Sequence, residues 1–247
     1  MLTIRLSSLT AALSLLSFPS VAADCKGLPG AGALSTLLQQ AQSVATFGHA
    51  GGIFDGARMW GAVVNRDGTI CSFATSTSDP SQVWPGSQAI AKAKAYTANA
   101  FNLDSGPGVP ILSTAMLYTF TQPGHSLWSL GQSNLFNTQF LAPPGGQGGG
   151  DNQIAGGLIF FGGGVPLYNS AGKIIGGLGI SGDTSCTDHE IAKRVRHLAS
   201  LDPPGGMTVD DITYSAPDGA SVFTHPQCLN TYRNGVKLGT EQPATGY

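Results

Sequence analysis

The sequence has few charged residues and lacks the long apolar run that a membrane-spanning helix requires. Charged side chains make up 11% of the 247 residues, and the formal net charge is −2. A nearly neutral chain lacks the basic surface that binds nucleic acid or anionic membranes. Apolar residues still reach 41%, which suits a folded core and excludes a disordered composition. We therefore expect a folded protein that neither binds nucleic acid nor inserts stably into a membrane.

The longest apolar run lies at the N-terminus and is too short to span a bilayer. Arg5 precedes an apolar stretch over residues 6–18, and Val21-Ala22-Ala23 places small residues before Asp24. This pattern is typical of a secretory signal peptide, here residues 1–23. We expect a periplasmic or secreted protein, with an uncleaved anchoring helix as the alternative.

Cysteine is scarce: the chain has Cys25, Cys71, Cys186 and Cys228. An even number in an exported chain predicts two disulfides, for which three connectivities are possible. We favour Cys25–Cys71 and Cys186–Cys228, which would attach the N-terminal arm and the C-terminal tail to the core. Free buried thiols are the alternative. No cysteine pair has zinc-finger spacing, so we do not expect a zinc site.

Two catalytic fingerprints are also missing. The chain has no Gly-x-Ser-x-Gly nucleophile elbow. We do not interpret the glycines at 162–164 and 176–179 as a dinucleotide-binding turn, because we expect them in a hairpin rather than at a strand-to-helix junction. They favour hairpin geometry and close packing of a helix on the sheet, or alternatively room for a flat ligand. Because no acid, base and nucleophile set is evident, we expect ligand binding rather than catalysis.

Hydrophobic spacing and turn residues predict an α+β fold. The predicted helices are Gly32–Phe47, Gln88–Phe101 after a Ser87 cap, a short one at Ser113–Tyr118, and a last helix with a Thr187–Glu190 capping box. The predicted strands are Met59–Val64, Thr69–Ala74, Val165–Tyr168, Lys173–Ile180 and Asp211–Ser215. The order of helix, hairpin, helix, long loop, hairpin and helix indicates a small antiparallel sheet with helices packed against it.

The last predicted helix has an apolar face and a charged face. Ile191 and Val195 are expected in the core, whereas Lys193, Arg194 and Arg196 are expected in solvent, with His189 and His197 on the surface. Asp188, near the start of this helix, is interpreted as a structural carboxylate that favours the helix dipole.

Domain boundaries follow from composition. Residues 24–202 are expected to form one domain with a Gly- and Pro-rich insertion near 135–155. Within it, residues 143–150 are nearly all Gly and Pro and are interpreted as a disordered linker. Residues 203–247 are expected to be a C-terminal extension packed on the same domain.

Several motifs, in a consistent order, resemble the GlcG/HbpS-like family over about residues 34–200. They are Gly61-Ala-Val-Val-Asn-Arg-Asp-Gly, Lys94-Ala-Tyr-Thr-Ala, Pro123-Gly, Phe161-Gly-Gly-Gly-Val-Pro-Leu and Ile175-Gly-Gly-Leu-Gly-Ile-Ser-Gly. That family includes exported heme-binding proteins, glycolate-operon accessory proteins and a domain attached to cobalamin adenosyltransferases. The resemblance implies a profilin-like α+β fold and homo-oligomers. This chain differs from the family in its insertion, in its tail with His225-Pro-Gln-Cys228, and in having His125 where a small residue is common.

The histidine at 125 is the candidate metal ligand. His125 lies in a loop beside Leu127 and Trp128. An imidazole among apolar and aromatic residues is a candidate axial ligand for heme iron. The alternative is a loop histidine that bonds to water.

Three further residues are candidates for ligand binding. Lys94, in the family's central-helix motif, can pair with a carboxylate such as a heme propionate or a small acid, or else be a solvated helix residue. Thr97 belongs to the same motif and can also bond back to its own helix. Arg58 can hold a carboxylate bidentately or form a surface salt bridge.

The function that these observations favour is binding of heme or a related tetrapyrrole by an exported protein. A second hypothesis is an accessory protein or enzyme that acts on a small hydroxy acid or aldehyde. A third is an extracytoplasmic sensor or interaction module that presents its sheet to a partner protein.

Overall fold

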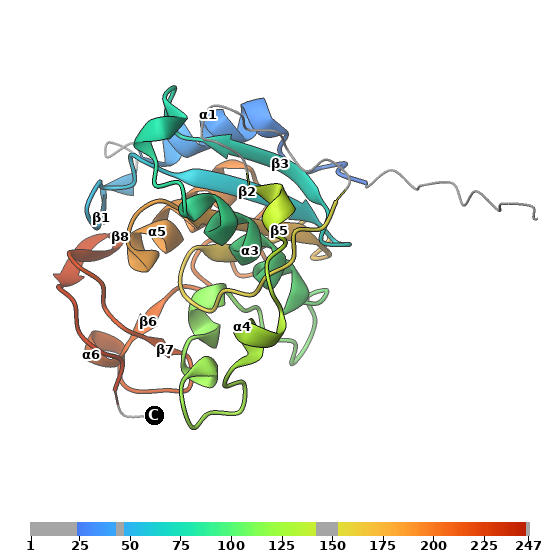
Figure 1. Cartoon of the computed structure of the whole chain (residues 1–247). Coiled ribbons are helices and arrows are strands. Elements are labelled where there is room, and N and C mark those ends of the chain that lie inside the picture. The colour runs from blue at the N-terminus through green and yellow to red at the C-terminus, as the bar shows by residue number, and fades with distance from the viewer. Residues whose placement is uncertain (1–23, 43–46, 142–152, 246–247) are drawn as a thin grey trace, which may run out of the picture.

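The computed structural model describes residues 24–42, 47–141 and 153–245 (Figure 1). The predicted signal peptide, 1–23, and the predicted linker, 143–150, lie outside these ranges. The centre of the described structure is a four-stranded antiparallel sheet of order β3-β2-β5-β4. Its strands are β2 (Trp60–Asn65), β3 (Ile70–Thr75), β4 (Gly164–Tyr168) and β5 (Ile174–Ser181).

The sheet consists of the two predicted hairpins joined through β2 and β5. The Asn65 side chain closes the first turn, since its Oδ1 accepts the N–H groups of Asp67 and Thr69 at 3.0 Å each. Gly68 takes the positive φ, +85°, that this turn requires. β2 and β5 then pair antiparallel, with Ala62 opposite Gly179. All four strands lie within one residue of their predicted bounds.

Helices cover both faces of the sheet (Figure 1). On one face α1 (Ala31–Ala41) and α5 (Ser185–Leu198) share an apolar core with the sheet, and on the other α3 (Ser87–Ala100) does so. The first core includes Leu34, Leu38, Leu178, Ile180 and Ile191, and the second includes Trp60, Ala62, Val64, Ala91 and Ala95. The predicted α+β class, an antiparallel sheet with helices packed against it, is confirmed.

Glycines in β5 allow α3 to lie close to the sheet. A Cβ at Gly177 would overlap the backbone oxygen of Ala95, and a Cβ at Gly179 would overlap the backbone of Ala91 and Ala95. Leu178, between them, points into the opposite core. The glycine-rich strand is therefore built for helix packing.

The remaining described elements are short or belong to the C-terminal extension. The loops contain η1 (Pro80–Gln82), η2 (Thr114–Leu117), η3 (Thr119–Thr121), α4 (Leu130–Ser133) and η4 (Thr138–Phe140). The extension contains β6 (Thr213–Tyr214), α6 (Ser215–Asp218), β7 (Thr224–His225) and β8 (Thr231–Gly239), which pairs antiparallel with β1 (His49–Gly51). In the described ranges, no helix has the length and apolar character needed to cross a membrane.

The structure contains the two disulfides favoured from the sequence, Cys25–Cys71 and Cys186–Cys228. The first ties the N-terminal arm to β3, and the second ties the C-terminal extension to the start of α5. Each closes a loop of more than 40 residues, so each restricts the unfolded chain substantially.

Four predictions about element bounds and caps were wrong. Ser87 is the first residue of α3, whose N-cap is Gly86. Helix α1 ends at Ala41, and residues 43–46 of the predicted helix lie outside the described ranges. The N-cap of α5 is Thr184, whose hydroxyl accepts the N–H of Thr187 at 3.4 Å, so the predicted capping box lies inside the helix. The predicted strand over 211–215 is only two residues long.

The charged face of α5 is buried, contrary to prediction. Lys193, Arg194 and Arg196 are each at most 1% exposed, and His189 is fully buried. The extension supplies partners to some of them: Arg196 binds the carboxylate of Asp210 through both terminal nitrogens, at 2.6 and 2.8 Å. Arg194 instead donates to backbone oxygens at residues 47–49. His197 remains on the surface as predicted, with its side chain 53% exposed.

Candidate functional site

A buried ion pair joins α3 to α5. Lys94, on α3, donates from Nζ to Asp188 Oδ2 at 2.7 Å and to the backbone oxygen of Ile180 at 3.0 Å. The ammonium also lies 5.1 Å from the ring centroid of Phe161. Lys94 is 0% exposed and Asp188 is 2% exposed. The predicted ligand-binding lysine is thus enclosed and already faces a carboxylate of the protein.

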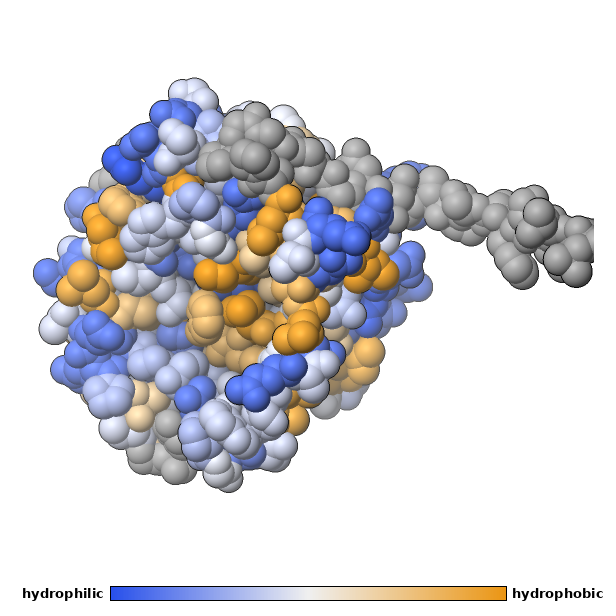
Figure 2. All heavy atoms as spheres, viewed as in Figure 1, coloured by the Kyte–Doolittle hydropathy of each residue, from blue (hydrophilic) through white to orange (hydrophobic). Residues whose placement is uncertain are grey.

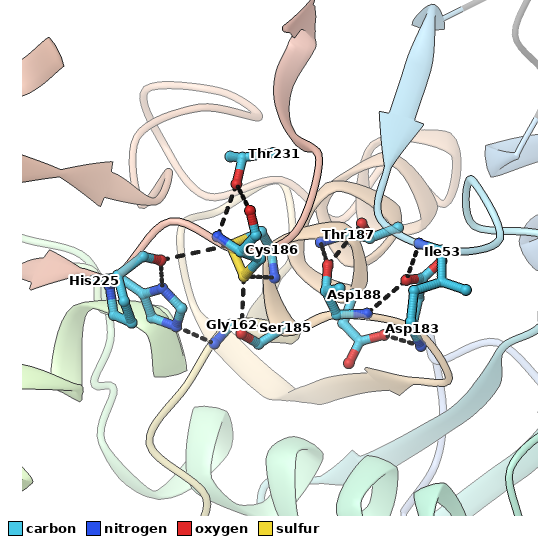
Figure 3. The surroundings of a disulfide bond; sticks show 12 residues. Ile53, Gly162, Asp183, Ser185, Cys186, Thr187, Asp188, His225 and Thr231 are labelled. Atoms are coloured by element: carbon cyan, nitrogen blue, oxygen red, sulfur yellow. Dashed lines mark hydrogen bonds between the residues drawn. A yellow bond between two sulfur atoms is a disulfide. The ribbon is translucent and has the colours of Figure 1, made fainter. Parts of the chain in front are cut away.

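Asp188 also organises the start of α5. Its Oδ1 accepts the N–H of Asp183 at 3.0 Å. Asp183 in turn accepts the N–H groups of Ile53 and Phe54 at 2.8 and 2.7 Å (Figure 3). Hydrogen bonds therefore link α3, the end of β5, the first turn of α5 and the loop after β1 through two carboxylates.

Burial dominates the titration of this pair. Removal from water raises the pKa of Asp188 to about 6, although the neighbouring Lys94 ammonium acts to lower it. Burial likewise lowers the pKa of Lys94, against the opposing effect of Asp188. Desolvation disfavours the charged form of each group, and the opposite charge of its partner favours it.

The raised pKa of Asp188 predicts a pH dependence of stability. The folded protein binds this proton more tightly than the unfolded chain, so the stabilising effect is complete below about pH 4 and is lost as the pH rises through about 6. We expect the unfolding free energy of the wild-type protein to fall between pH 4 and 7 relative to that of Asp188→Asn, because the buried carboxyl group ionises in that range. Urea denaturation of both proteins at several pH values measures this difference, and parallel curves would contradict it.

Thr97 supports an apolar groove beside α3. Its hydroxyl donates to the backbone oxygen of Ala93 at 2.7 Å, which is the predicted bond back to its own helix, and accepts the N–H of Ile159 at 3.0 Å. The second bond holds the segment before β4 against α3. The groove that results has a volume of about 200 Å³, and its lining includes Ile90, Ala93, Leu135, Phe136, Leu158 and Ile159. Figure 2 shows hydrophobic side chains gathered on this face over α3 and α4.

His125 and Arg58 lie in separate surroundings. His125 is half-buried in a turn that backbone hydrogen bonds hold. Its backbone N–H donates to the oxygen of Gln122, and its backbone oxygen accepts the N–H of Trp128, at 3.1 Å each. That turn leads into α4, whose Gly131 lines the groove. Arg58 is exposed at the start of β2, with its guanidinium 4.9 Å from the centroid of the Phe54 ring. Of the four predicted residues, the structure brings Lys94 and Thr97 together on α3.

Two contacts in this region are not evident from the sequence. Asp188 is structural, as predicted, but its Oδ2 binds Lys94. His225 lies beside the Cys186–Cys228 disulfide, with a ring nitrogen that could ligate a metal within 4.8 Å of both sulfurs. The only local signal for the second cluster was the His225-Pro-Gln-Cys228 spacing, and residue 186 is distant in sequence.

Three solved structures are similar to this chain. The crystal structure of Klebsiella pneumoniae protein ORFY is 20% identical, with a TM-score of 0.44, covering 68% of this chain and 85% of that chain. The PduOC:heme complex is 22% identical, with a TM-score of 0.42 and coverage of 66% and 90%. A double mutant of Streptomyces reticuli HbpS is 19% identical, with a TM-score of 0.36 and coverage of 78% and 98%.

A comparison with curated proteins found no match. The family model described as "Haem degrading protein HbpS-like" matches residues 37–196, which include the whole four-stranded sheet, α3 and most of α5. The chain therefore belongs to the HbpS-like family.

Proposed function

We propose that this protein is exported and binds heme or a related tetrapyrrole. The observation that carries the proposal is the match of residues 37–196 to a family described as heme-degrading. Two disulfides are compatible with an oxidising compartment outside the cytoplasm. Bound heme would supply the redox chemistry of its iron, while the protein would supply the contact surface and an axial ligand.

The described residues fit a tetrapyrrole that lies on the surface. A porphyrin ring is flat and largely apolar, and the groove beside α3 offers an apolar wall. Its volume of about 200 Å³ is below the usual range for pockets that enclose a ligand, so the groove would receive the edge of the ring. Leu135, 79% exposed, and Trp128, 53% exposed, supply further apolar surface on the same loop region.

The exposure of each predicted residue decides which of them we propose to contact the tetrapyrrole. His125 is the proposed axial ligand, because it lies on the loop that leads into α4. Arg58 is the better candidate for a propionate, because it is exposed and because a 3.4 Å bond from its Nη1 to the backbone oxygen of Gln82 places it near the loop before α3. Lys94, enclosed with Asp188, would act by holding α3 in place, and Thr97 by holding the groove wall.

A hemin titration tests the proposal. We expect a shift of the Soret band at micromolar hemin with one hemin per chain, and we expect His125→Ala to alter the bound spectrum and weaken binding at least tenfold. His197→Ala is the matched control, because His197 is an exposed histidine paired with Asp202 at 2.6 Å. Absence of any Soret shift in the wild-type protein would overturn heme binding. A shift that His125→Ala leaves unchanged would overturn only the choice of axial ligand.

A further inference from the structure

Three metal-binding side chains meet at the start of α5. Cys186 lies in the first turn of that helix, His225 ends β7, and Cys228 follows three residues later. The two sulfur atoms and a ring nitrogen of His225 all lie within 4.8 Å of one another (Figure 3). In the structure the two cysteines form a disulfide, with their Cα atoms 5.9 Å apart.

Hydrogen bonds orient the histidine of this cluster. The Nδ1 of His225 lies 2.7 Å from the backbone oxygen of Pro226, which can only accept, so Nδ1 carries the proton. The other nitrogen, Nε2, accepts the N–H of Gly162 at 3.2 Å. His225 is 1% exposed. The ring is thus held as a neutral imidazole, and its Nε2 lone pair can bind a cation only after it gives up the Gly162 N–H.

The surroundings favour a thiolate at Cys228, whereas the Cys186 sulfur lies 3.6 Å from the backbone oxygen of Pro226. Cys228 Sγ accepts the N–H of Cys186 at 3.1 Å, in the first turn of α5, and lies 3.4 Å from the hydroxyl of Ser185. Amide donors at a helix N-terminus stabilise a sulfur anion. Thr231 fixes the Cys228 backbone, accepting its N–H at 2.8 Å and donating to its oxygen at 2.7 Å.

We propose that reduction of the Cys186–Cys228 disulfide creates a Cys₂His site for a thiolate-preferring divalent cation such as Zn²⁺. A phosphine reductant would supply two electrons to the sulfur–sulfur bond and take oxygen from water to become the phosphine oxide, while the two cysteines take up two protons. Binding of Zn²⁺ then displaces both thiol protons. Two thiolates and an imidazole are preferred zinc ligands, and the fourth position stays open to water.

The backbone can accommodate this change. Zn–S bonds of about 2.3 Å at tetrahedral angles place two sulfurs roughly 3.8 Å apart, a separation that side-chain rotation at fixed backbone positions can supply. Ligation through Nε2 would release the N–H of Gly162 and keep the Nδ1–H bond to Pro226. A metal-bound histidine commonly makes such a bond to a backbone carbonyl through its other nitrogen. With Nε2 as the ligand, the site requires the disulfide to open and the Gly162 bond to break, but no change of histidine tautomer.

Titration of the purified protein with Co²⁺, a spectroscopic substitute for Zn²⁺, tests the proposal. After phosphine reduction we expect one Co²⁺ per chain, with a thiolate-to-cobalt charge-transfer band and the intense visible bands of tetrahedral Co²⁺, displaced by Zn²⁺. We expect no such bands from the oxidised protein or from reduced Cys186→Ser/Cys228→Ser. Reduced Cys25→Ser/Cys71→Ser should bind as the wild type does, and His225→Ala at least tenfold more weakly, with His197→Ala unchanged.

Several outcomes overturn the proposal. Reduced protein that stays folded by circular dichroism yet gives no bands excludes the site, as does binding that survives loss of Cys186 and Cys228. Binding that His225→Ala leaves unchanged excludes the three-ligand set. If reduction unfolds the protein, the proposal requires that Zn²⁺ restore the native circular dichroism spectrum, since a cation that binds only the folded state stabilises it. Failure to refold with Zn²⁺ then excludes the site.

Discussion

Asp188→Ala is expected to lower the free energy of unfolding at pH 7 by about 3–5 kcal/mol, the usual effect of removing one partner of a buried ion pair. The Lys94 ammonium would be left with the backbone oxygen of Ile180 and no counter-charge, in a position that water does not reach. The N–H of Asp183 would also lose its acceptor. A domain of this kind is typically stable by only about 5–15 kcal/mol, so the loss would be a large fraction of the total.

Urea denaturation of matched variants tests this prediction. Lys173→Met, which removes an exposed lysine, is the control and should change stability by less than about 0.5 kcal/mol. The double variant Lys94→Met/Asp188→Leu removes both charges and should recover much of the loss, because well-packed apolar side chains can replace a buried pair. A cost below about 1 kcal/mol for Asp188→Ala would contradict the assignment of this pair as a buried structural contact.

The hairpins could be predicted from the sequence because their signals are local. The turn at Asn65–Gly68 requires a side-chain acceptor and a residue with positive φ, and both are in the turn itself. Flanking apolar residues then define the strands. These local signals predict the ends of each strand to within one residue. They do not predict that β2 pairs with β5.

The burial of α5 could not be predicted from its own residues. A helix with Lys193, Arg194 and Arg196 on one face normally turns that face to solvent. Glu190 of the same helix binds Lys193 at 2.6 Å. The other partners come from elsewhere: the carboxylate of Asp211 binds Lys193 at 2.8 Å, and backbone oxygens at 47–49 accept from Arg194. A pattern of charges within one helix cannot reveal counter-charges from a C-terminal extension.

The candidate site shows the same limit. Lys94 and Thr97 were located through the family motif, and Thr97 forms the expected bond within its helix. The partner of Lys94, Asp188, is 94 residues away, so no local spacing connects the two. Cys186 and His225 are likewise brought together only by the tertiary fold. Pairwise chemistry between distant segments therefore required the structure.

Gly179→Ala is the second substitution with a large expected effect, a loss of roughly 3 kcal/mol or more of unfolding free energy. The added Cβ would overlap the backbone oxygen of Ala91 and the backbone nitrogen of Ala95, both in the middle of α3. Backbone atoms of a packed helix cannot rotate away as a flexible side chain can. The substitution must therefore push α3 away from β5 and loosen the core that contains Trp60 and Ala95.

Gly32→Ala is the matched control, because it adds the same methyl group in α1 with no atom within 4 Å of the new Cβ. Alanine is favoured over glycine inside a helix by about 1 kcal/mol, so this variant should be as stable as the wild type or more stable. Urea denaturation of both variants compares the two sites directly. If Gly179→Ala proves as harmless as Gly32→Ala, then α3 does not rest on β5 as closely as the structure shows. If only Gly179→Ala is costly, the glycine-rich strand is required for helix packing, and the groove beside α3 depends on it.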